Sequence, residues 1–350
     1  FVSKTRYAVS LCTCMSDEEV EAKLAQIPQV DYDRIGERMH VELVYVNCDE
    51  NADAAKFTAL VEKAKGLGRT LILGCTDPEI AKAALEVCKD GKPVLNGANA
   101  SNYEAMNKVA TDAGVVLGVS GKDINELYDT TAAIEKLGNK NLVLDTTGAD
   151  VKETFANTVQ VRRAALKNQD RTFGYPSIVN VVKLAKGDYH LQAALASLFT
   201  MKYGSIIVME QMTYAEALPL FGLRQNVFTD PQKPMKVEPG IYPLNGADEN
   251  SLVVTTVDFA LTYFVVSGEL ERSGVPLNLV INDAGGLSVL TSWAAGKFSG
   301  NSISEYIKEN VEPKVKCRRL VIPGKVAVLK GDLEAKLPGW EIIVGPREAV

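Results

Sequence analysis

Two adjacent glycines in the last quarter of the chain are well placed to bring the backbone close to a ligand. Gly285 and Gly286 follow the apolar run 277–282, which is typical of a short buried strand, and precede the amphipathic segment 287–293, which is typical of a helix. A glycine pair at this junction allows a close approach of the backbone, and the first amides of the helix then face the ligand. The alternative is a tight turn that needs two glycines for its own geometry. The G-x-G-x-x-G spacing of dinucleotide sites is incomplete.

Three further apolar runs, 251–256, 319–322 and 340–344, end in Thr, Pro-Gly or Gly and are separated by helical patterns. This layout predicts a small parallel α/β sheet whose ligand lies at the carboxyl ends of its strands. The sequence lacks a P-loop lysine and an acidic residue at the ribose-binding offset, so a nucleotide fits poorly. We expect a large ligand that is recognised by hydroxyls and bare backbone amides. The groups at these ends are Thr255, Thr256, Thr262, Gly324 and Gly345.

The preceding 230 residues repeat a strand-then-helix pattern, which predicts an α/β fold with a (β/α)8 TIM barrel. A doubly wound open sheet is the alternative. Prolines and glycines concentrate after residue 229, which indicates a linker. We therefore expect a barrel at 1–232, a linker at 233–250 and a smaller C-terminal domain at 251–350. The predicted barrel strands are 7–12, 41–47, 70–75, 93–97, 115–119, 142–145, 177–182 and 205–209.

The predicted strand ends of the barrel carry few catalytic side chains. Asp145 and Glu210 could form a carboxylate pair, although such groups are more often caps or loop partners, so we assign no catalytic residue. His40 is expected on the surface or in a loop, and His190 on a helix. Cys12 and Cys14 are the only close thiol pair, so the spacing supports no metal site. The other polar residues at these ends are Asn47, Asp49, Cys75, Asp77, Asn96 and Thr146.

Composition restricts the partners and the compartment. The net charge is −6 and the basic residues are scattered, which argues against nucleic acid and against an anionic membrane. The chain contains no run of 18 apolar residues, so we expect no transmembrane helix. The six cysteines lie mostly in strand or helix patterns, which predicts reduced thiols and a cytoplasmic location. Because the chain begins at Phe1 without a Met, we expect both ends to be clipped.

Several segments resemble the large (gamma) subunit of the corrinoid iron–sulfur protein, a methyl carrier of the anaerobic acetyl-CoA (Wood–Ljungdahl) pathway. The C-terminal hundred residues are the most specific part, although the resemblance spans essentially the whole chain. The segments that carry it are Thr255-Thr256, Leu261-Thr-Tyr263, 286–298, 322–331 and 339–349 in the C-terminal domain, and 102–106, 142–145, 161–163, 173–176 and 224–231 before it.

The resemblance implies a Rossmann-like C-terminal domain that binds a cobamide base-off, without a protein histidine on cobalt. It also implies a [4Fe-4S] domain before residue 1. Cob(I)amide would accept a methyl group from methyltetrahydrofolate on a separate methyltransferase, and methyl-Co(III) would donate it to acetyl-CoA synthase. The further implied partners are the small (delta) subunit and a reductive activator. The chain would act as a carrier in methyl transfer rather than as a stand-alone enzyme.

The resemblance also implies which residues contact the cobamide. The threonines would bind the corrin side-chain amides, a second group would line its lower face, and a third would hold the nucleotide tail. Without the resemblance, strand propensity and capping would be the favoured explanation of the threonines. The three groups are Thr255, Thr256 and Thr262; Ala284, Gly285, Gly286 and Leu287; and Gly324, Gly345, Pro346 and Glu348.

Two other functions remain open at this point. A barrel-type pterin methyltransferase would need an Asp/Asn cluster in the barrel mouth, for which Asn96 and Asp145 are partial support. A non-catalytic scaffold subunit would use its C-terminal domain to contact a partner. The colour of the purified protein distinguishes these alternatives from a corrinoid carrier.

Overall fold

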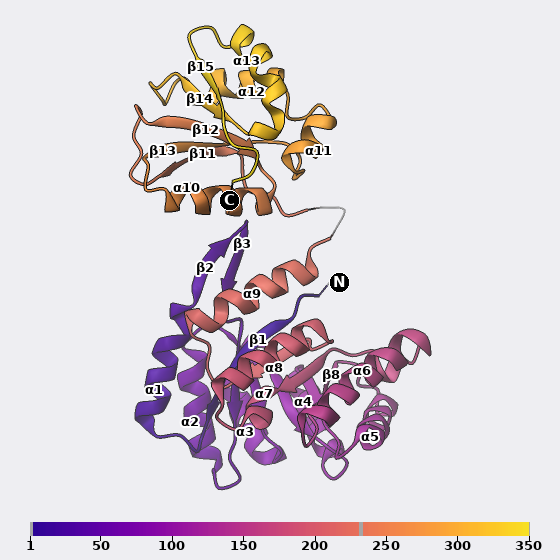
Figure 1. Cartoon of the computed structure of the whole chain (residues 1–350). Helices are drawn as coiled ribbons and strands as arrows, with labels where there is room; N and C mark the ends of the chain where they lie inside the picture. The colour runs from indigo at the N-terminus through magenta and orange to yellow at the C-terminus, as the bar shows by residue number, and fades with distance from the viewer. Residues whose placement is uncertain (1–2, 231–233, 350) are drawn as a thin grey trace. The chain divides into compact units, whose positions relative to one another are not determined.

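The computed structural model describes residues 3–230 and 234–349 (Figure 1). The chain divides into two compact units. The first comprises residues 1–32 and 38–228, and the second comprises residues 33–37 and 229–350. Residues 231–233, which are the last two residues of the predicted barrel and the first of the predicted linker, lie outside the described residues.

The first unit contains a closed barrel of parallel strands in the order β1-β10-β9-β8-β7-β6-β5-β4. Each strand is paired with its neighbour in parallel register; for example, Cys12 of β1 pairs with Asn47 of β4. The predicted TIM barrel is therefore confirmed, and the open-sheet alternative is wrong. The strands are β1 Arg6–Cys12, β4 Leu43–Asn47, β5 Thr70–Gly74, β6 Val94–Ala98, β7 Val116–Val119, β8 Leu142–Asp145, β9 Ser177–Asn180 and β10 Ile206–Met209.

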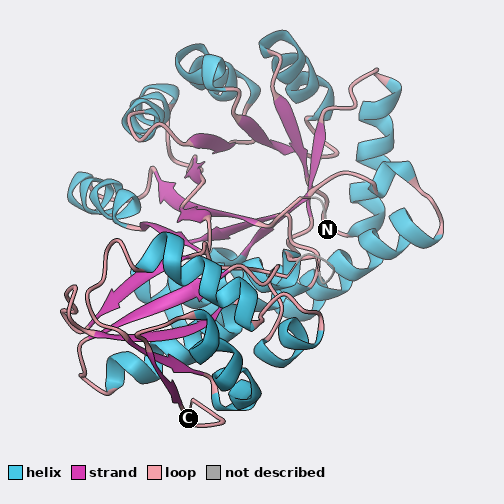
Figure 2. Ribbon diagram, turned by 90° about the horizontal axis from the view of Figure 1, so that it is seen from above, coloured by secondary structure: helices cyan, strands magenta, loops and turns pink. Residues whose placement is uncertain are grey.

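Helices lie around the outside of these strands (Figure 2). A large apolar core fills the space between strands and helices, and includes Tyr7, Val9 and Leu11 of β1. A separate cluster that includes Ala8 and Tyr45 alternates with it along the strands and fills the barrel interior. The helices are α1 Asp17–Gln26, α2 Ala54–Lys65, α3 Pro78–Cys88, α4 Tyr103–Ala113, α5 Ile124–Lys136, α6 Val151–Lys167, α7 Val181–Ala185, α8 Tyr189–Met201 and α9 Tyr214–Phe228, with 3-10 turns at Ile27–Gln29, Lys89–Gly91 and Arg171–Phe173.

Two histidine predictions have different outcomes. His190 lies on α8, as predicted. His40 is half-buried in a strand, so its prediction as a surface or loop residue is wrong. It belongs to a two-stranded sheet formed by β2 Asp31–Arg34 and β3 Glu37–His40. The sequence of this hairpin is polar on both strands and gives little apolar alternation to detect.

The second unit contains a five-stranded sheet in the order β11-β13-β12-β14-β15. The strands β13, β12, β14 and β15 run parallel to one another. The edge strand β11 pairs antiparallel with β13. Residues 240–244, expected in the linker, are therefore a sheet strand, because their backbone pairs with the buried strand β13. The strands are β11 Gly240–Leu244, β12 Leu252–Val257, β13 Leu277–Asn282, β14 Arg319–Ile322 and β15 Glu341–Val344.

The two faces of this sheet carry different layers. α10 Ala260–Arg272 covers one face together with an apolar cluster that includes Leu279 and Ile281. The remaining helices lie on the opposite face (Figure 1), over a larger core that includes Val280 and Phe298. They are α11 Val289–Ala294, α12 Gly300–Tyr306 continued by a π-helical turn at Ile307–Val311, a 3-10 segment at Gly324–Leu329 and α13 Lys330–Lys336.

Candidate functional site

A cavity of about 580 Å³ lies in the second unit, between α10 and the sheet. Residues from both ends of α10 line it, so it extends along the helix. It also reaches the segments that follow β13, β14 and β15. Cavities of this size accommodate drug-sized ligands or a part of a larger one. The predicted site residues that line it are Thr255, Thr256, Thr262, Gly345, Pro346 and Glu348.

Thr255 and Thr256 of β12 are each only 1% exposed, but only the Thr255 hydroxyl has hydrogen-bond partners among the described residues. The Thr255 hydroxyl donates to the Val280 carbonyl oxygen at 3.2 Å and accepts from the Asn282 side-chain amide. Thr256 lines the same cavity, and its buried hydroxyl has no hydrogen-bond partner among the described residues. An unpartnered buried hydroxyl costs free energy unless a ligand or water satisfies it. Thr256 is therefore the strongest ligand-binding candidate of the site.

The Gly-Gly turn after β13 is organised by a buried carboxylate that the sequence reasoning missed. Asp258, which is 0% exposed, accepts hydrogen bonds from the amide of Ala284 at 3.0 Å and from that of Gly286 at 3.0 and 3.1 Å. The Gly285 amide donates to the Asp283 carboxylate at 3.0 Å. The prediction that this turn presents bare amides to a ligand is wrong, because aspartates occupy those amides. An aspartate two residues after a predicted strand was the available signal.

The four predicted lower-face residues, 284–287, are absent from the lining of this cavity, but the three residues that follow them line it. Both glycines have positive φ, 69° for Gly285 and 73° for Gly286, which only glycine adopts readily. A Cβ on Gly286 would lie 3.1 Å from Pro234 Cγ. The turn thus needs its glycines for its own geometry, and it positions residues 288–290 at the cavity.

The amides of two further predicted glycines are also occupied. Gly324 donates to the Pro346 carbonyl oxygen at 3.0 Å, and Gly345 donates to the Ile322 carbonyl oxygen at 2.9 Å. These two hydrogen bonds join the segments after β14 and β15. A Cβ on Gly324 would lie 2.4 Å from the Gly345 oxygen, so glycine is required by the close approach of two backbones. The prediction of bare amides is wrong here too, because backbone carbonyls satisfy them.

Charged residues lie at the end of the cavity formed by the C-terminal segment. Lys325 Nζ and Glu348 Oε1 form an ion pair at 2.7 Å, and both residues line the cavity together with Arg347. Glu348, predicted to hold the nucleotide tail, therefore neutralises a lysine. With two cations against this carboxylate, the three residues carry a net positive charge that suits an anionic group.

Apolar side chains that the sequence reasoning did not single out form most of the lining. Leu261, at the start of α10, is 63% exposed, and Val265 and Leu290 are also exposed, so the cavity opens onto an apolar surface. The sequence signal for Leu261 and Val265 was a second apolar stripe on α10, in which the residues are four apart. A helix that packs one face against a sheet needs only one apolar stripe, so the second one indicates another contact.

In the barrel, Asn96 and Asp145 meet but are enclosed. The Asn96 side-chain amide donates to Asp145 Oδ2 at 3.0 Å and lies 3.4 Å from the Tyr45 hydroxyl. The two side chains are only 5% and 9% exposed. Burial raises the pKa of Tyr45, so its phenol stays protonated beside this pair. Glu210 accepts from the Tyr189 hydroxyl, so each carboxylate of the suggested catalytic pair has a partner of its own.

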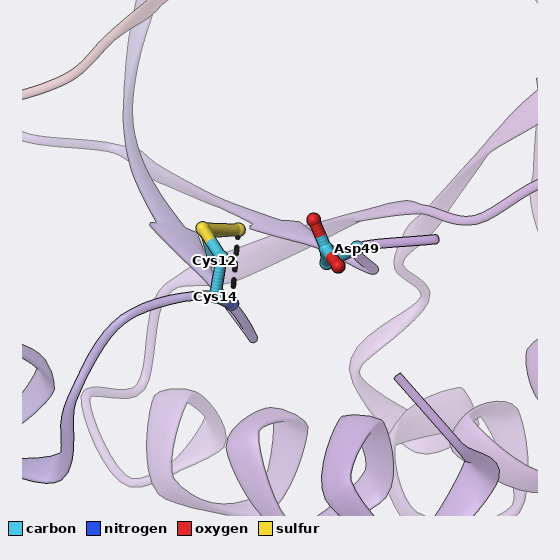
Figure 3. Close-up of side chains that lie close together, drawn as sticks. All are labelled: Cys12, Cys14 and Asp49. Carbon is cyan, nitrogen blue, oxygen red and sulfur yellow. Dashed lines mark hydrogen bonds between the residues drawn. A yellow bond between two sulfur atoms is a disulfide. The ribbon is translucent and has the colours of Figure 1, made fainter. Parts of the chain in front are cut away.

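The cysteine prediction is only partly right. Cys12 and Cys14 are joined by a disulfide, so the expectation of reduced thiols is wrong for this pair, because the turn after β1 brings the two sulfur atoms together. Cys48, Cys75, Cys88 and Cys317 are free. Asp49 lies beside the disulfide (Figure 3).

Comparison with known proteins identifies the family. A family model described as CO dehydrogenase/acetyl-CoA synthase delta subunit matches residues 1–350. The chain belongs to this family. It is 39% identical over 350 residues to the corrinoid/iron-sulfur protein large subunit of Moorella thermoacetica, and the match covers 100% of the chain and 78% of that protein. It is 34% identical to the acetyl-CoA decarbonylase/synthase complex subunit gamma of Methanopyrus kandleri, with coverage of 96% and 74%. The resemblance seen in the sequence is thereby confirmed.

Solved structures with some similarity include the dihydropteroate synthases of Vibrio fischeri and Thermus thermophilus. Their TM-scores are 0.49 and 0.48, their sequence identities are 16% and 15%, and they cover 66% and 64% of the chain and 96% and 95% of their own chains. In the part of the chain that the structure describes, no helix is long and apolar enough to cross a membrane.

Proposed function

We propose that the second unit is a Rossmann-like corrinoid-binding domain and that the chain carries methyl groups in the acetyl-CoA pathway. The names of the full-length relatives, corrinoid/iron-sulfur protein large subunit and acetyl-CoA decarbonylase/synthase subunit gamma, support this function. The observation in this chain that carries the proposal is the buried, unpartnered hydroxyl of Thr256, a residue that lines the cavity along α10.

The residues present fit a cobamide. A corrin carries amide side chains that can donate to or accept from a hydroxyl, and Thr256 offers a buried one. Thr262, which lines the same cavity, offers a second hydroxyl. The exposed apolar side chains of Leu261 and Leu290 suit the hydrocarbon parts of a ligand that is too large to be fully enclosed. Thr255 is better explained as a structural residue, because its hydroxyl already has two partners.

The cobamide nucleotide contains a phosphate, and the charged end of the cavity suits it. Lys325 and Arg347 would hold this group, and Glu348 would keep Lys325 in place through the ion pair. Gly345 and Pro346 would bound the tail sterically, since both line the cavity. Gly324 would act indirectly, through its hydrogen bond to Pro346.

When bound, the corrinoid supplies a cobalt centre that accepts and releases a methyl group. Both histidines of the chain lie before residue 229, so the second unit offers no imidazole as an axial ligand, which supports base-off binding. The turn held by Asp258 would orient residues 288–290 toward the ligand. The segment 284–287 would shape the site through this turn instead of lining the lower face of the ring.

The names of the relatives, which describe subunits of a larger complex, support partner subunits for this chain. We propose a small (delta) subunit, a methyltetrahydrofolate methyltransferase, acetyl-CoA synthase and a reductive activator as partners. We also propose a [4Fe-4S] cluster held by a domain before residue 1, a cytoplasmic location, a barrel domain at 1–232, and a C-terminal domain at 251–350 whose sheet is completed by β11. In this arrangement the barrel is a scaffold, because its Asn96–Asp145 pair is enclosed.

The test compares the wild-type chain with Thr256→Val under anaerobic conditions. We expect the reconstituted wild-type protein to show corrinoid absorption bands and equimolar cobalt. Loss of one hydrogen bond to a neutral group corresponds to about 1 kcal/mol, so we expect Thr256→Val to weaken cobamide binding about fivefold. Ser304→Ala is the control, because its buried hydroxyl belongs to α12 and donates to the Asn301 carbonyl oxygen. A cobalt-free protein, even with its partner subunit present, would contradict the carrier function, and binding of methyltetrahydrofolate by that protein would favour the barrel methyltransferase.

A further inference from the structure

A disulfide closes the turn at the carboxyl end of β1, in the barrel and outside the cobamide site. Cys12 is the last residue of β1 and Cys14 lies in the turn that follows. Cys14 is exposed and Cys12 is half-buried. The carboxylate of Asp49, from the loop after β4, faces the same pair (Figure 3), and the three potential ligand atoms lie within 4.8 Å of one another. An exposed sulfur at the carboxyl end of a barrel strand is accessible to a reacting partner.

Two donors stabilise negative charge on the sulfur of Cys12. The Cys14 amide donates to Cys12 Sγ at 3.2 Å, and the Asn47 side-chain amide donates to it at 3.6 Å (Figure 3 shows the first). Hydrogen bonds to a sulfur favour its thiolate form and make it a better leaving group. When a thiolate attacks the disulfide, Cys14 Sγ is therefore the accessible target and Cys12 Sγ is the better leaving group.

The position of this bond argues against a purely stabilising role. It joins residues two apart in sequence, and closing so short a loop restricts the unfolded chain little. The other thiols of the barrel also differ from this pair. Burial raises the pKa of Cys75 to about 12 and that of Cys88 to about 11, so these thiols stay protonated and unreactive near neutral pH.

We propose that Cys12 and Cys14 form a reversible thiol–disulfide exchange site whose substrate is a dithiol reductant. A thiolate of the reductant attacks Cys14 Sγ, and Cys12 Sγ leaves with the electron pair and takes up a proton. The second thiolate of the reductant then attacks the reductant sulfur in the mixed disulfide and releases Cys14. The reductant becomes a disulfide, and both cysteines become thiols.

The test equilibrates the full-length protein anaerobically in defined mixtures of reduced and oxidised dithiothreitol. The sample is quenched with acid, alkylated after unfolding and analysed by intact mass and peptide mapping. We expect a cooperative transition of two thiols that maps to Cys12 and Cys14. Cys14→Ser should abolish it. Cys317→Ser, which changes a half-buried free cysteine of the second unit, should leave it unchanged.

Two results would overturn the exchange site: both thiols remain free in fully oxidised buffer, or the disulfide survives excess reduced dithiothreitol. A third result would replace it with a metal site made of Cys12, Cys14 and Asp49. In that case the reduced protein would retain equimolar Zn²⁺ after dialysis, and the metal alone would prevent reoxidation. Asp49→Asn separates these possibilities, because it should abolish Zn²⁺ retention by a metal site but leave an exchange site active.

Discussion

Asp258 and Gly286, 28 residues apart in sequence, are joined by hydrogen bonds from one glycine amide to both carboxylate oxygens, at 3.0 and 3.1 Å. The carboxylate is fully buried, and Lys236 Nζ lies 4.0 Å from its Oδ2 atom. The end of β12 therefore determines the conformation of the turn after β13. Since the three residues after that turn line the cavity, Asp258 affects the proposed cobamide site without touching it.

We predict that Asp258→Asn destabilises the second unit by about 3 kcal/mol, because it weakens hydrogen bonds to a buried charged acceptor. Asp283→Asn is the matched control. This exposed aspartate accepts one turn amide, and its replacement should cost less than about 1 kcal/mol. Both tryptophans, Trp293 and Trp340, lie in the second unit, so tryptophan fluorescence during urea unfolding reports on this unit. Equal unfolding midpoints for the two variants would contradict the role of Asp258.

We predict that Gly286→Ala is more destabilising than Gly296→Ala. Both glycines have positive φ, 73° and 72°, so alanine introduces about 1–2 kcal/mol of backbone strain at either position. A Cβ at position 296 meets no atom within 4 Å, whereas at position 286 it lies 3.1 Å from Pro234 Cγ. The crowding should add about 1 kcal/mol.

The same urea experiment measures both glycine variants. A bulkier residue at position 286 should also remove the corrinoid and leave the barrel folded, which cobalt analysis and circular dichroism check together. Full cobalt occupancy in Gly286→Leu would show that the turn does not shape the site.

The barrel could be predicted because its signals are local. Each strand is a short apolar run, and several helices begin with a recognisable cap, such as the Ser16–Glu19 capping box, which the structure contains. The hairpin β2–β3 gave no such signal, since its turn uses Ile35 at φ 49° instead of an Asn-Gly or Asp-Gly pair. Asn102 directly precedes α4, but its side chain accepts the Asn99 amide and does not cap the helix.

The site could be predicted only in part, because hydrogen bonds between distant residues decide which groups are available. The sequence indicates hydroxyls and glycines at strand ends, and Thr256 and Gly345 do line the cavity. It does not show that Asp258 occupies the turn amides, or that the Thr255 hydroxyl is satisfied by Val280 and Asn282. These partners come from a neighbouring strand or turn, so no local pattern specifies them.

We predict opposite effects of valine at the two threonines in the cobamide-free protein. Thr255→Val removes an acceptor for the Asn282 amide and a donor to the Val280 oxygen, so it should cost about 1–3 kcal/mol of unfolding free energy. Thr256→Val removes an unpartnered buried hydroxyl, so it should be neutral or stabilising. Urea unfolding followed by tryptophan fluorescence measures both. A destabilised Thr256→Val variant would mean that this hydroxyl already has a partner within the protein.

We predict that the capping box of α1 gives the barrel a pH-dependent contribution to stability at acid pH. The Ser16 amide donates to Glu19 Oε2 at 2.8 Å and the Ser16 hydroxyl at 2.9 Å, and these hydrogen bonds, the backbone one first, lower the pKa of the Glu19 carboxyl. Because the folded pKa lies below the unfolded one, the contribution is fully present above the unfolded pKa. It is lost as the pH falls through the folded pKa.

Ser16→Ala should raise the pKa of Glu19 only part of the way to its ordinary value, since the backbone donor at position 16 remains. NMR titration of the Glu19 side-chain carboxyl measures this change directly. Ser197→Ala is the control, because its hydroxyl donates to the Ala193 oxygen within α8. If Glu19 titrated identically in Ser16→Ala and in the wild-type protein, the serine hydroxyl would make no contribution to the lowered pKa.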